Sequence, residues 1–413
     1  MVIVEFLDRE PLENVVSILA NRPEKMILVG ASSELEAYLP AVQRFAQRVS
    51  PETEVVTQPI VKTKLSKIVK VLSRIAQENP GCSFDLGGGD DLAMVAMGIV
   101  FERFRKEGIQ LHQYNLRTGK VYDCDGDKEF PSADIPPLSV EETIILHGGC
   151  VVKAEEKPGG TMPWIWDEEF ARDVEKMWAI NAADCGKWNA QISTLSHMLE
   201  YVPAQEDPLQ LSVPVPEFRR WLDRREFYLD LKGIFPRLQR AGLISELVNE
   251  GDVFSLRFKN EQVKRALAKA GTILELKTAM VARGMQGENG PAFSDVQTGV
   301  FIDWDGVVHD SQEYLVDTEN EIDVILMEGV LPVFISCKNG SVGEEELYKL
   351  HTVATRFGGK YVRKLLVATT FGKGAKGMQY FRERADDMHI HIVEGVQNMD
   401  DASFAEALRE ALR

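Results

Sequence analysis

Short apolar runs alternate with longer segments of helical period in residues 1–150. Each run has the length of a buried strand and is followed by a turn and a helical segment. This alternation is typical of a doubly wound α/β domain, in which helices cover both faces of a mostly parallel sheet. The predicted strands are MVIVEFL (1–7), KMILVGAS (25–32), CSFDLGG (82–88) and IQLHQYN (109–115). A further strand is expected to end at His147, in VEETIILHG.

Residues 151–267 have a different pattern, because apolar positions recur at helical spacing over most of the segment. A hairpin-like stretch, LISELVNEGDVFSLRFKN, follows these helices and has Gly251 at its turn. Helices followed by such a hairpin indicate a winged-helix-like connector.

Residues 268–413 return to mixed α/β patterning, with a helix, three strands, a helix, a strand, a helix and a final strand. The stretch NEIDVILMEGVLPVFISCK is predicted to form two neighbouring strands, 320–327 and 331–337, joined at Glu328-Gly329. The chain is therefore divided into an N-terminal domain (1–150), a connector (151–267) and a C-terminal domain (268–413).

The predicted hairpin is apolar except for a few charged and polar positions. Positions two apart share a face of a strand, so Glu321 and Asp323 are expected to point together, and Ser336 and Lys338 to point together from the neighbouring strand. Buried charges need partners. A divalent cation is such a partner, and carboxylate oxygens favour Mg²⁺ or Mn²⁺. This pattern indicates a metal-dependent phosphodiesterase in which Lys338 holds the attacking water or the developing negative charge.

The order of elements and the acid, acid and lysine pattern resemble the PD-(D/E)xK nucleases, which have the restriction-endonuclease-like fold. The resemblance implies a further acid on the preceding helix, and Glu275 occupies the matching place. One residue departs from the family pattern, because Ser336 stands where the second acid is expected, two before Lys338. We infer that Glu321 replaces this carboxylate. The implied catalytic residues are Asp323, Lys338, Glu321, Glu275 and Ser336. The implied metal ligands are Asp323, Glu321, Glu275 and the backbone carbonyl of Cys337.

Two other interpretations of this half of the chain remain. The hairpin can be a solvent-facing one that carries Glu, Asp and Lys without binding a metal. The upstream stretch IDWDGVVHDS also looks like the loop of haloacid-dehalogenase-type phosphatases, with Asp303 as nucleophile and Asp305 as acid/base. That chemistry needs a later lysine and acid pair after a strand, which the sequence does not supply. We expect Asp305-Gly306 to form a turn instead, with Asp303 exposed or near the metal.

Small residues open two predicted helices of the N-terminal domain directly after strands, in VGASSE and DLGGGDDLAM. Ligands of doubly wound sheets bind at such strand ends, and helix N-termini favour anions. Neither loop is a dinucleotide or P-loop motif. The acidic pair Asp90-Asp91 fits contacts to ribose or base better than contacts to a dense phosphate.

These loops, with VEETIILHG at the domain end and the nuclease motifs, resemble the proteins of type III CRISPR systems that join a CARF sensor domain to a nuclease. The resemblance spans nearly the whole chain. It implies activation by a cyclic oligoadenylate, typically cyclic tetra-adenylate, in a two-fold homodimer that cleaves DNA or RNA. The implied ligand contacts are Ser32, Ser33, Gly87, Gly88, Gly89 and Asp90, with Thr63 and Lys64 as further candidates.

Two alternatives to an activated nuclease stay open. The protein can be a ligand-controlled regulator that binds nucleic acid and has an inactive nuclease domain, which the substitution at Ser336 would explain. It can also be a ring nuclease, in which the sensor domain cleaves its own cyclic ligand with positioned hydroxyls and backbone donors.

Composition limits the setting of either activity. The chain has 413 residues and a formal net charge of -17 at pH 7, which disfavours indiscriminate nucleic-acid binding but allows a local basic groove. The five cysteines are scattered, so neither a disulfide framework nor a zinc site is indicated. The N-terminus lacks the pattern of a signal peptide, and no apolar run reaches the roughly 18 residues of a membrane span. We expect a cytoplasmic protein.

Overall fold

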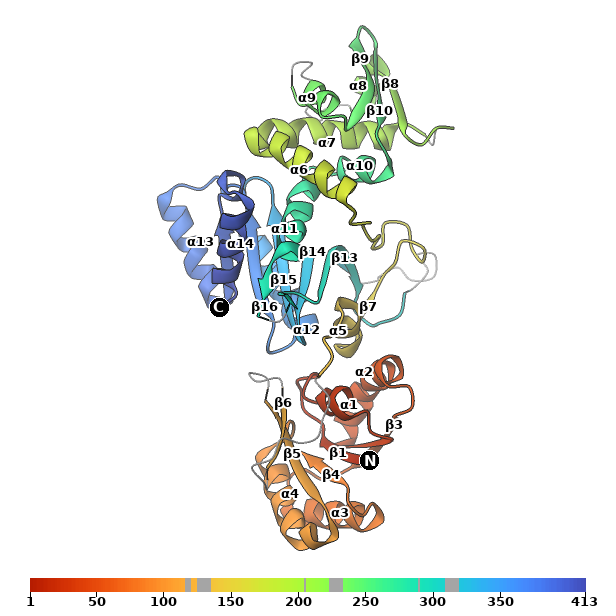
Figure 1. Cartoon of the computed structure of the whole chain (residues 1–413), viewed down its shortest axis with the longest axis vertical. Helices are drawn as coiled ribbons and strands as arrows, with labels where there is room; N and C mark the ends of the chain where they lie inside the picture. The colour runs from red at the N-terminus through yellow and green to blue at the C-terminus, as the bar shows by residue number, and fades with distance from the viewer. Residues whose placement is uncertain (116–119, 125–134, 204–205, 223–232, 289, 309–318) are drawn as a thin grey trace.

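The computed structural model describes the chain except for residues 116–119, 125–134, 204–205, 223–232, 289 and 309–318. Two six-stranded sheets and one three-stranded sheet are arranged along the long axis of the molecule (Figure 1). The first sheet is formed by the N-terminal residues, the second by the C-terminal residues, and the small sheet lies at the far end.

The first sheet has strand order β3-β2-β1-β4-β5-β6. Its first five strands are parallel and β6 is antiparallel to β5. The strands are β1 (Val2–Phe6), β2 (Lys25–Gly30), β3 (Glu54–Pro59), β4 (Ser83–Asp85), β5 (Gln110–Asn115) and β6 (Lys120–Asp123). Helices α1 (Val16–Asn21) and α2 (Ser32–Val49) pack on one face, and α3 (Leu65–Glu78) and α4 (Asp91–Phe104) on the other. The predicted doubly wound fold and its four predicted strands are confirmed.

Polar side chains are buried inside this first sheet, beneath the turn that follows β4. Glu5, Asp85 and His112 are at most 1% exposed. His112 Nε2 lies 3.1 Å from Asp85 Oδ2, and Ser17 Oγ donates to Glu5 Oε2 over 3.4 Å. Burial, and next the charge of Asp85, raise the pKa of Glu5 well above its ordinary value. The carboxyl group of Glu5 therefore keeps its proton to higher pH than an exposed glutamate does, and in that form it can donate a hydrogen bond to Asp85.

Replacing Glu5 with glutamine is expected to stabilise the protein at alkaline pH. The folded protein keeps a proton on Glu5 that the unfolded chain loses above the ordinary pKa of 4.5. Stability is therefore lost, by about 1.4 kcal/mol per pH unit, as the pH rises from the unfolded pKa toward the folded one. Glutamine is neutral in both states. In urea unfolding, the stability of Glu5→Gln relative to the native protein should increase as the pH rises above 4.5, and the two proteins should match below that pH. Parallel pH profiles would contradict this assignment, and Glu24→Gln, at an exposed side chain, is the control.

The second sheet has strand order β17-β16-β15-β14-β13-β7. Its strands are β7 (Cys150–Val151), β13 (Asp295–Asp303), β14 (Glu319–Glu328), β15 (Leu331–Lys338), β16 (Arg363–Ala368) and β17 (Ile390–Glu394). Helices α5 (Val140–Leu146), α12 (Glu345–Gly358) and α13 (Ala375–Asp387) pack on one face, and α11 (Thr272–Gly284) and α14 (Asp401–Ala411) on the other. The predicted hairpin is confirmed as β14 and β15, which pair antiparallel around Gly329. A short ribbon, β11 (Gln286–Gly287) and β12 (Gly290–Pro291), precedes β13.

The strand predicted before His147 is wrong, because Val140–Leu146 is helix α5. Ser139 and Glu142 form a capping box at its start, in which each side chain accepts a hydrogen bond from the other residue's backbone. The β-branched residues that favoured a strand are outweighed by this cap and by packing of α5 against α2 and the second sheet.

The connector is mostly helical and contains the predicted hairpin, which belongs to a small three-stranded sheet. It contains α6 (Glu168–Ala183), α7 (Cys185–Tyr201), β8 (Gln210–Pro214), α8 (Val215–Leu222), α9 (Phe235–Arg240), β9 (Ile244–Glu250), β10 (Val253–Phe258) and α10 (Glu261–Ala266). The strands pair in the order β8-β10-β9, and the expected turn lies at Gly251.

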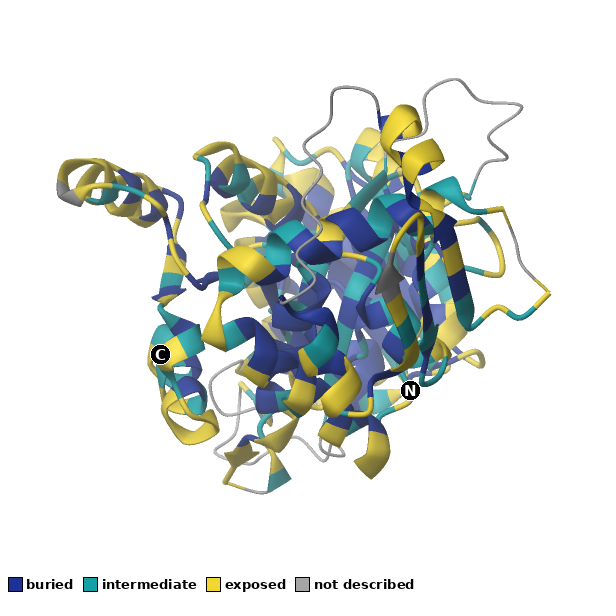
Figure 2. Cartoon of the chain, turned by 90° about the horizontal axis from the view of Figure 1, so that it is seen from above, coloured by how far each residue is buried: buried dark blue, intermediate teal, exposed yellow. Residues whose placement is uncertain are grey.

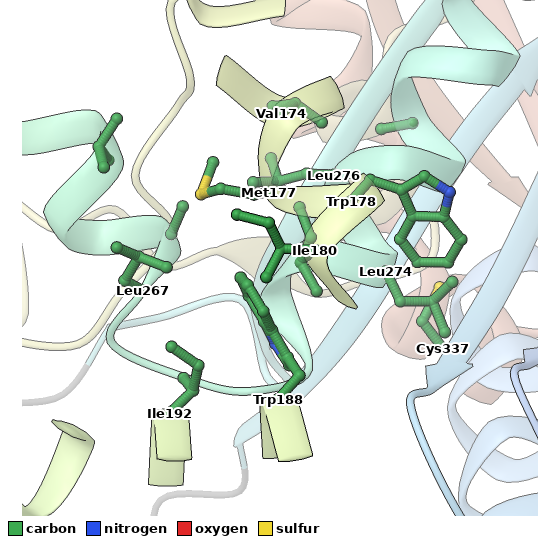
Figure 3. Packing of buried hydrophobic residues seen from close by; sticks show 14 of the residues in the cluster. Val174, Met177, Trp178, Ile180, Trp188, Ile192, Leu267, Leu274, Leu276 and Cys337 are labelled. Carbon is green, nitrogen blue, oxygen red and sulfur yellow. The ribbon is translucent and has the colours of Figure 1, made fainter. Parts of the chain in front are cut away.

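Two hydrophobic cores join these parts. One core runs from α6 and α7 to α11 and β15, and Figure 3 shows Trp188, Trp178, Leu274 and Cys337 within it. The other joins α1 and α2 of the first sheet to α5, α12 and the opposite face of the second sheet. Buried residues fill the interior of the molecule, and exposed residues lie on the outer faces of the helices (Figure 2). Each neighbouring part is thus connected to the second sheet by apolar packing.

Candidate functional site

The hairpin of β14 and β15 brings Asp323 against Ser336 and Lys338. Asp323 Oδ2 accepts hydrogen bonds from Cys337 N at 2.6 Å and from Ser336 Oγ at 3.2 Å. Lys338 Nζ lies 3.7 Å from the same oxygen. All the described contacts of this carboxylate use Oδ2, and Oδ1 receives no hydrogen bond from the described residues. Three of the four residues predicted to share a patch therefore make direct contacts.

The fourth, Glu321, is oriented by a break in the alternation of β14. Ile322 belongs to one core and Val324 to the other, although strict alternation would place both on the same face. The break lies at Asp323, opposite Gly299 of β13, which has a φ of 59°. Glu321 Oε2 pairs with Lys269 Nζ at 3.4 Å instead of contacting Lys338.

Glu275 projects from the first turn of α11 toward these carboxylates, as the resemblance implied. Its flanking residues Leu274 and Leu276 are fully buried in the core with α6 and α7 and fix the helix in place. Burial raises the pKa of Glu275 to about 8, and the charges of Asp323 and Glu321 contribute to the rise. Glu275 is thus held protonated at neutral pH, because it is buried and because two other carboxylates lie near it.

The carboxylate oxygens of these residues are suitable ligands for a divalent cation such as Mg²⁺ or Mn²⁺. A cation would relieve the mutual repulsion of Asp323, Glu321 and Glu275, and Oδ1 of Asp323 is available to it. Within the described ranges, however, no set of three His, Cys, Asp or Glu side chains is close enough together to hold a metal ion. Binding would therefore require the carboxylates to approach one another, and the proposed ligation by the Cys337 carbonyl stays a prediction.

Two residues of this site have no signal in the sequence. Glu346 of α12 accepts from Lys338 Nζ at 2.9 Å, which is closer than Asp323. Although burial works to lower it, the charges of Asp323 and Glu346 raise the pKa of Lys338. Asn339, directly after Lys338, bonds to two asparagines of the connector: its Nδ2 donates to Asn181 Oδ1 at 2.7 Å and to Asn189 Oδ1 at 2.9 Å. Helices α6 and α7 thereby fix the end of β15.

The phosphatase interpretation is not supported by the surroundings of Asp303. This side chain is 1% exposed, and its Oδ1 accepts hydrogen bonds from the backbone of Asp305, Gly306 and Val307. The predicted turn at Asp305-Gly306 is confirmed. The expectation that Asp303 is exposed is wrong, because its carboxylate is turned inward to hold that turn.

The candidate ligand residues of the first domain lie at the carboxyl ends of its parallel strands. Ser32 and Ser33 form the exposed first turn of α2 after β2, and Thr63 and Lys64 are exposed before α3. Strand order reverses beside β1, so ligands are expected between the ends of β1 and β4.

The turn after β4 is packed closely against β1. Gly87 N donates to Asp85 Oδ1 at 2.7 Å, and Gly89 N donates to Asp8 Oδ2 at 3.3 Å. A Cβ atom at Gly88 would lie 2.5 Å from the carbonyl oxygen of Phe6, so only glycine fits there. Asp90 caps α4 by accepting from Ala93 N, which gives it a structural role in addition to any ligand contact.

The loop that follows β1 contacts the segment between α12 and β16 of the second domain. Glu10 Oε2 accepts from Lys360 N at 2.6 Å, and Glu13 accepts a hydrogen bond from the Tyr361 hydroxyl. Asp8, which holds Gly89, also accepts from Glu10 N at 2.8 Å. Hydrogen bonds therefore run from the turn after β4 to the end of α12, the helix that carries Glu346.

Together these features define the fold: a doubly wound, Rossmann-like sheet and a second mixed sheet, joined by a helical, winged-helix-like connector. The predicted fold class is confirmed. Among the described helices, none combines the length and apolar character that crossing a bilayer requires.

Solved structures share this whole architecture. Protein VC1899 from Vibrio cholerae aligns over 100% of this chain and 97% of its own, with 15% identity and a TM-score of 0.68. Can2 from Sulfobacillus thermosulfidooxidans, in complex with cyclic tetra-adenylate, aligns over 100% and 97% with 15% identity and a TM-score of 0.65. At this identity the agreement establishes the fold. No family model and no curated protein matches the sequence.

Proposed function

We propose that the protein is a metal-dependent endonuclease of type III CRISPR defence that is activated by a cyclic oligoadenylate, with cyclic tetra-adenylate as the expected activator. The observation that carries the proposal is the convergence of Asp323, Lys338 and Glu275 from three elements, with the pKa of Glu275 raised to about 8. The fold shared with Can2, which was solved with cyclic tetra-adenylate, supports the choice of activator.

Lys338 and Glu346 provide the chain's own contribution to cleavage. Because its pKa is raised, Lys338 stays protonated and can hold an anionic phosphate oxygen or orient a water. Mn²⁺ or Mg²⁺ would be held by Asp323, Glu321, Glu275 and the Cys337 carbonyl. When bound, such an ion activates water and stabilises charge on a phosphodiester. Ser336 orients Asp323 through its hydroxyl and does not replace the missing acid.

We assign sensing to residues 1–150, connection to 151–267 and cleavage to 268–413. The cyclic ligand would bind at the ends of β1, β2 and β4, where the proposed contacts are Ser32, Ser33, Gly87, Gly88, Gly89 and Asp90, with Thr63 and Lys64 beside them. A ring with internal symmetry favours a two-fold homodimer.

Ligand-dependent movement of the turn after β4 would reach α12 through the hydrogen bonds of Asp8 and Glu10. The connector would transmit the same movement through the core that it shares with α11. DNA and single-stranded RNA are both proposed substrates, and we place the activity in the cytoplasm.

A second candidate is a ligand-controlled regulator with an inactive nuclease domain. The bond between Ser336 Oγ and Asp323 favours it, because a hydroxyl occupies the position at which the nuclease pattern has a second metal-binding acid. The two candidates differ in whether metal and ligand together produce cleavage.

The experiment that tests the proposal measures cleavage of labelled single-stranded RNA, single-stranded DNA and supercoiled plasmid. Each substrate is incubated with and without cyclic tetra-adenylate and with Mn²⁺ or EDTA. Cleavage that needs both ligand and metal supports the activated nuclease. Ligand binding without cleavage of any substrate supports the regulator.

Gly299 is expected to be required for this activity beyond its contribution to stability. An alanine in this left-handed conformation costs about 1–2 kcal/mol, and relief of the strain would shift the strand opposite Asp323. Gly329→Ala is a matched control, since Gly329 has a similar φ of 63° but open space around its Cα, in the hairpin turn. Both variants should lose similar stability in urea. Only Gly299→Ala should slow cleavage, by about tenfold or more. Equal cleavage rates in the two variants would show that Gly299 is not needed for activity.

A further inference from the structure

A cavity of about 520 Å³ lies at the junction of the two large sheets, apart from both sites described above. Its walls come from the loop after β1, the middle of α2, the end of α5 and the end of α12. The ionisable residues that line it are Arg9, Glu10, Tyr38, His147, Arg356 and Lys360. Its volume is in the range of small-molecule sites.

Three cationic side chains of this junction pocket form no salt bridge with any described residue. Among the described residues, neither Arg9 nor Arg356 forms an ion pair. Lys360 Nζ lies 3.4 Å from the Tyr361 hydroxyl and 5.0 Å from the centre of its ring, and its charge works to lower the pKa of Glu13. Unpaired cations gathered in one cavity are unusual in a chain with a formal net charge of -17. Their arrangement leaves a local excess of positive charge that an anion would neutralise.

The single carboxylate in the pocket is already engaged. Glu10 Oε2 accepts from Lys360 N at 2.6 Å, and Oε1 accepts from Leu12 N at 3.4 Å. Glu10 is 8% exposed and therefore does not reach out to the guanidinium groups of Arg9 or Arg356. The guanidinium groups of Arg9 and Arg356 are therefore left without a salt bridge in the described part of the pocket.

A buried imidazole adds a polar group without a hydrogen-bond partner. His147 is 7% exposed, and its Nδ1 faces the carbonyl oxygen of Thr143 at 2.8 Å, so Nδ1 carries a proton. Its Nε2 forms no hydrogen bond of good geometry within the described part of the chain. Its nearest partner is Glu10 Oε1 at 3.7 Å, and His147 works to lower the pKa of Glu10. Buried polar atoms of this kind are normally satisfied by a ligand or by water.

We propose that the junction pocket binds the phosphate group of a nucleoside monophosphate. Arg9, Arg356 and Lys360 would contact the phosphate, and the half-buried ring of Tyr38 offers a surface on which a base can stack. Because Arg9 belongs to the first sheet's loop and Arg356 to α12 of the second domain, the bound nucleotide bridges the same two parts that Glu10 and Lys360 connect. The proposal does not depend on nuclease activity or on the cyclic ligand.

The test is isothermal titration of the full-length protein with AMP and with adenosine. AMP is expected to bind at least about tenfold more tightly than adenosine, since a phosphate held by several cations contributes more than about 1.4 kcal/mol. Arg356→Gln and Lys360→Gln, both at exposed residues that should leave the fold intact, are each expected to weaken AMP binding by about tenfold. Arg384→Gln, which removes an exposed cation of α13, should leave AMP binding unchanged.

Three results would overturn the proposal: no binding of AMP, equal affinity for AMP and adenosine, or native affinity in both Arg356→Gln and Lys360→Gln. Thermal unfolding of each variant checks that the fold is retained. Added salt should weaken AMP binding by the native protein and should not weaken any residual binding by Arg356→Gln. This result would support a charged contact.

Discussion

Replacing Lys338 with methionine is expected to lower the rate of activated cleavage by about 10² to 10³-fold, with binding of the cyclic ligand unchanged. Lys338 is held between Asp323 and Glu346, which keep its ammonium group protonated and aimed at the carboxylate cluster. Methionine preserves the length and the apolar contacts of the stem but removes the charge. The loss should therefore appear in the chemical step and not in the fold.

The matched control is Lys349→Met. Lys349 also pairs with Glu346, at 3.2 Å, but its side chain is 67% exposed and forms no ion pair with Asp323 among the described residues. Its removal should change the cleavage rate by less than about twofold, because exposed ion pairs contribute little. Native activity in Lys338→Met, measured under single-turnover conditions, would exclude this lysine from the reaction and with it the assignment of the site.

Replacing Trp188 with alanine is expected to produce the largest loss of stability, about 3–5 kcal/mol in the free energy of unfolding. Trp188 is fully buried in the core shared by the connector and the second sheet (Figure 3). Its indole Nε1 donates to the carbonyl oxygen of Ala270 at 3.1 Å, immediately before α11, the helix that carries Glu275. The alanine variant creates a cavity at this junction and also leaves that carbonyl without its indole donor.

Trp188→Phe separates these two contributions, since it keeps most of the apolar volume and removes the hydrogen bond. A loss of about 1–3 kcal/mol is expected for it in urea unfolding. Tyr380→Ala, at a side chain on α13 that is 69% exposed, should change stability by less than about 0.5 kcal/mol. A small effect of Trp188→Ala would show that the connector and the second sheet unfold separately, contrary to a shared core.

The β14 and β15 hairpin could be predicted from the sequence because both strands and their turn lie in one short, continuous stretch of the chain. Two apolar runs flank a turn at Gly329, and the charged positions stand out within them. The pattern alone could not show that Glu321 turns toward Lys269 and away from Lys338. That orientation depends on the break of alternation opposite Gly299, which involves a strand about twenty residues earlier in the chain.

The remaining parts of the site depend on contacts between distant residues. Glu346 is one of several acids in a helix, and only packing of α12 on β15 places it beside Lys338. Glu10 and Lys360 are 350 residues apart, so their hydrogen bond has no local pattern. Helix α5 is the exception, because the capping box of Ser139 and Glu142 was readable in the sequence and should have outweighed its β-branched residues.

The most direct test of the account is the cleavage of labelled single-stranded DNA and RNA by the native protein and by Asp323→Asn, with cyclic tetra-adenylate and Mn²⁺ present. Asparagine keeps the shape of Asp323 and an oxygen that can accept from Cys337 N and Ser336 Oγ, so the fold should be retained. The account predicts ligand-dependent cleavage by the native protein, a loss of at least about 10³-fold in Asp323→Asn, and equal ligand affinity in both. Cleavage that persists in Asp323→Asn, or a native protein that binds the ligand and cuts neither substrate, would contradict it.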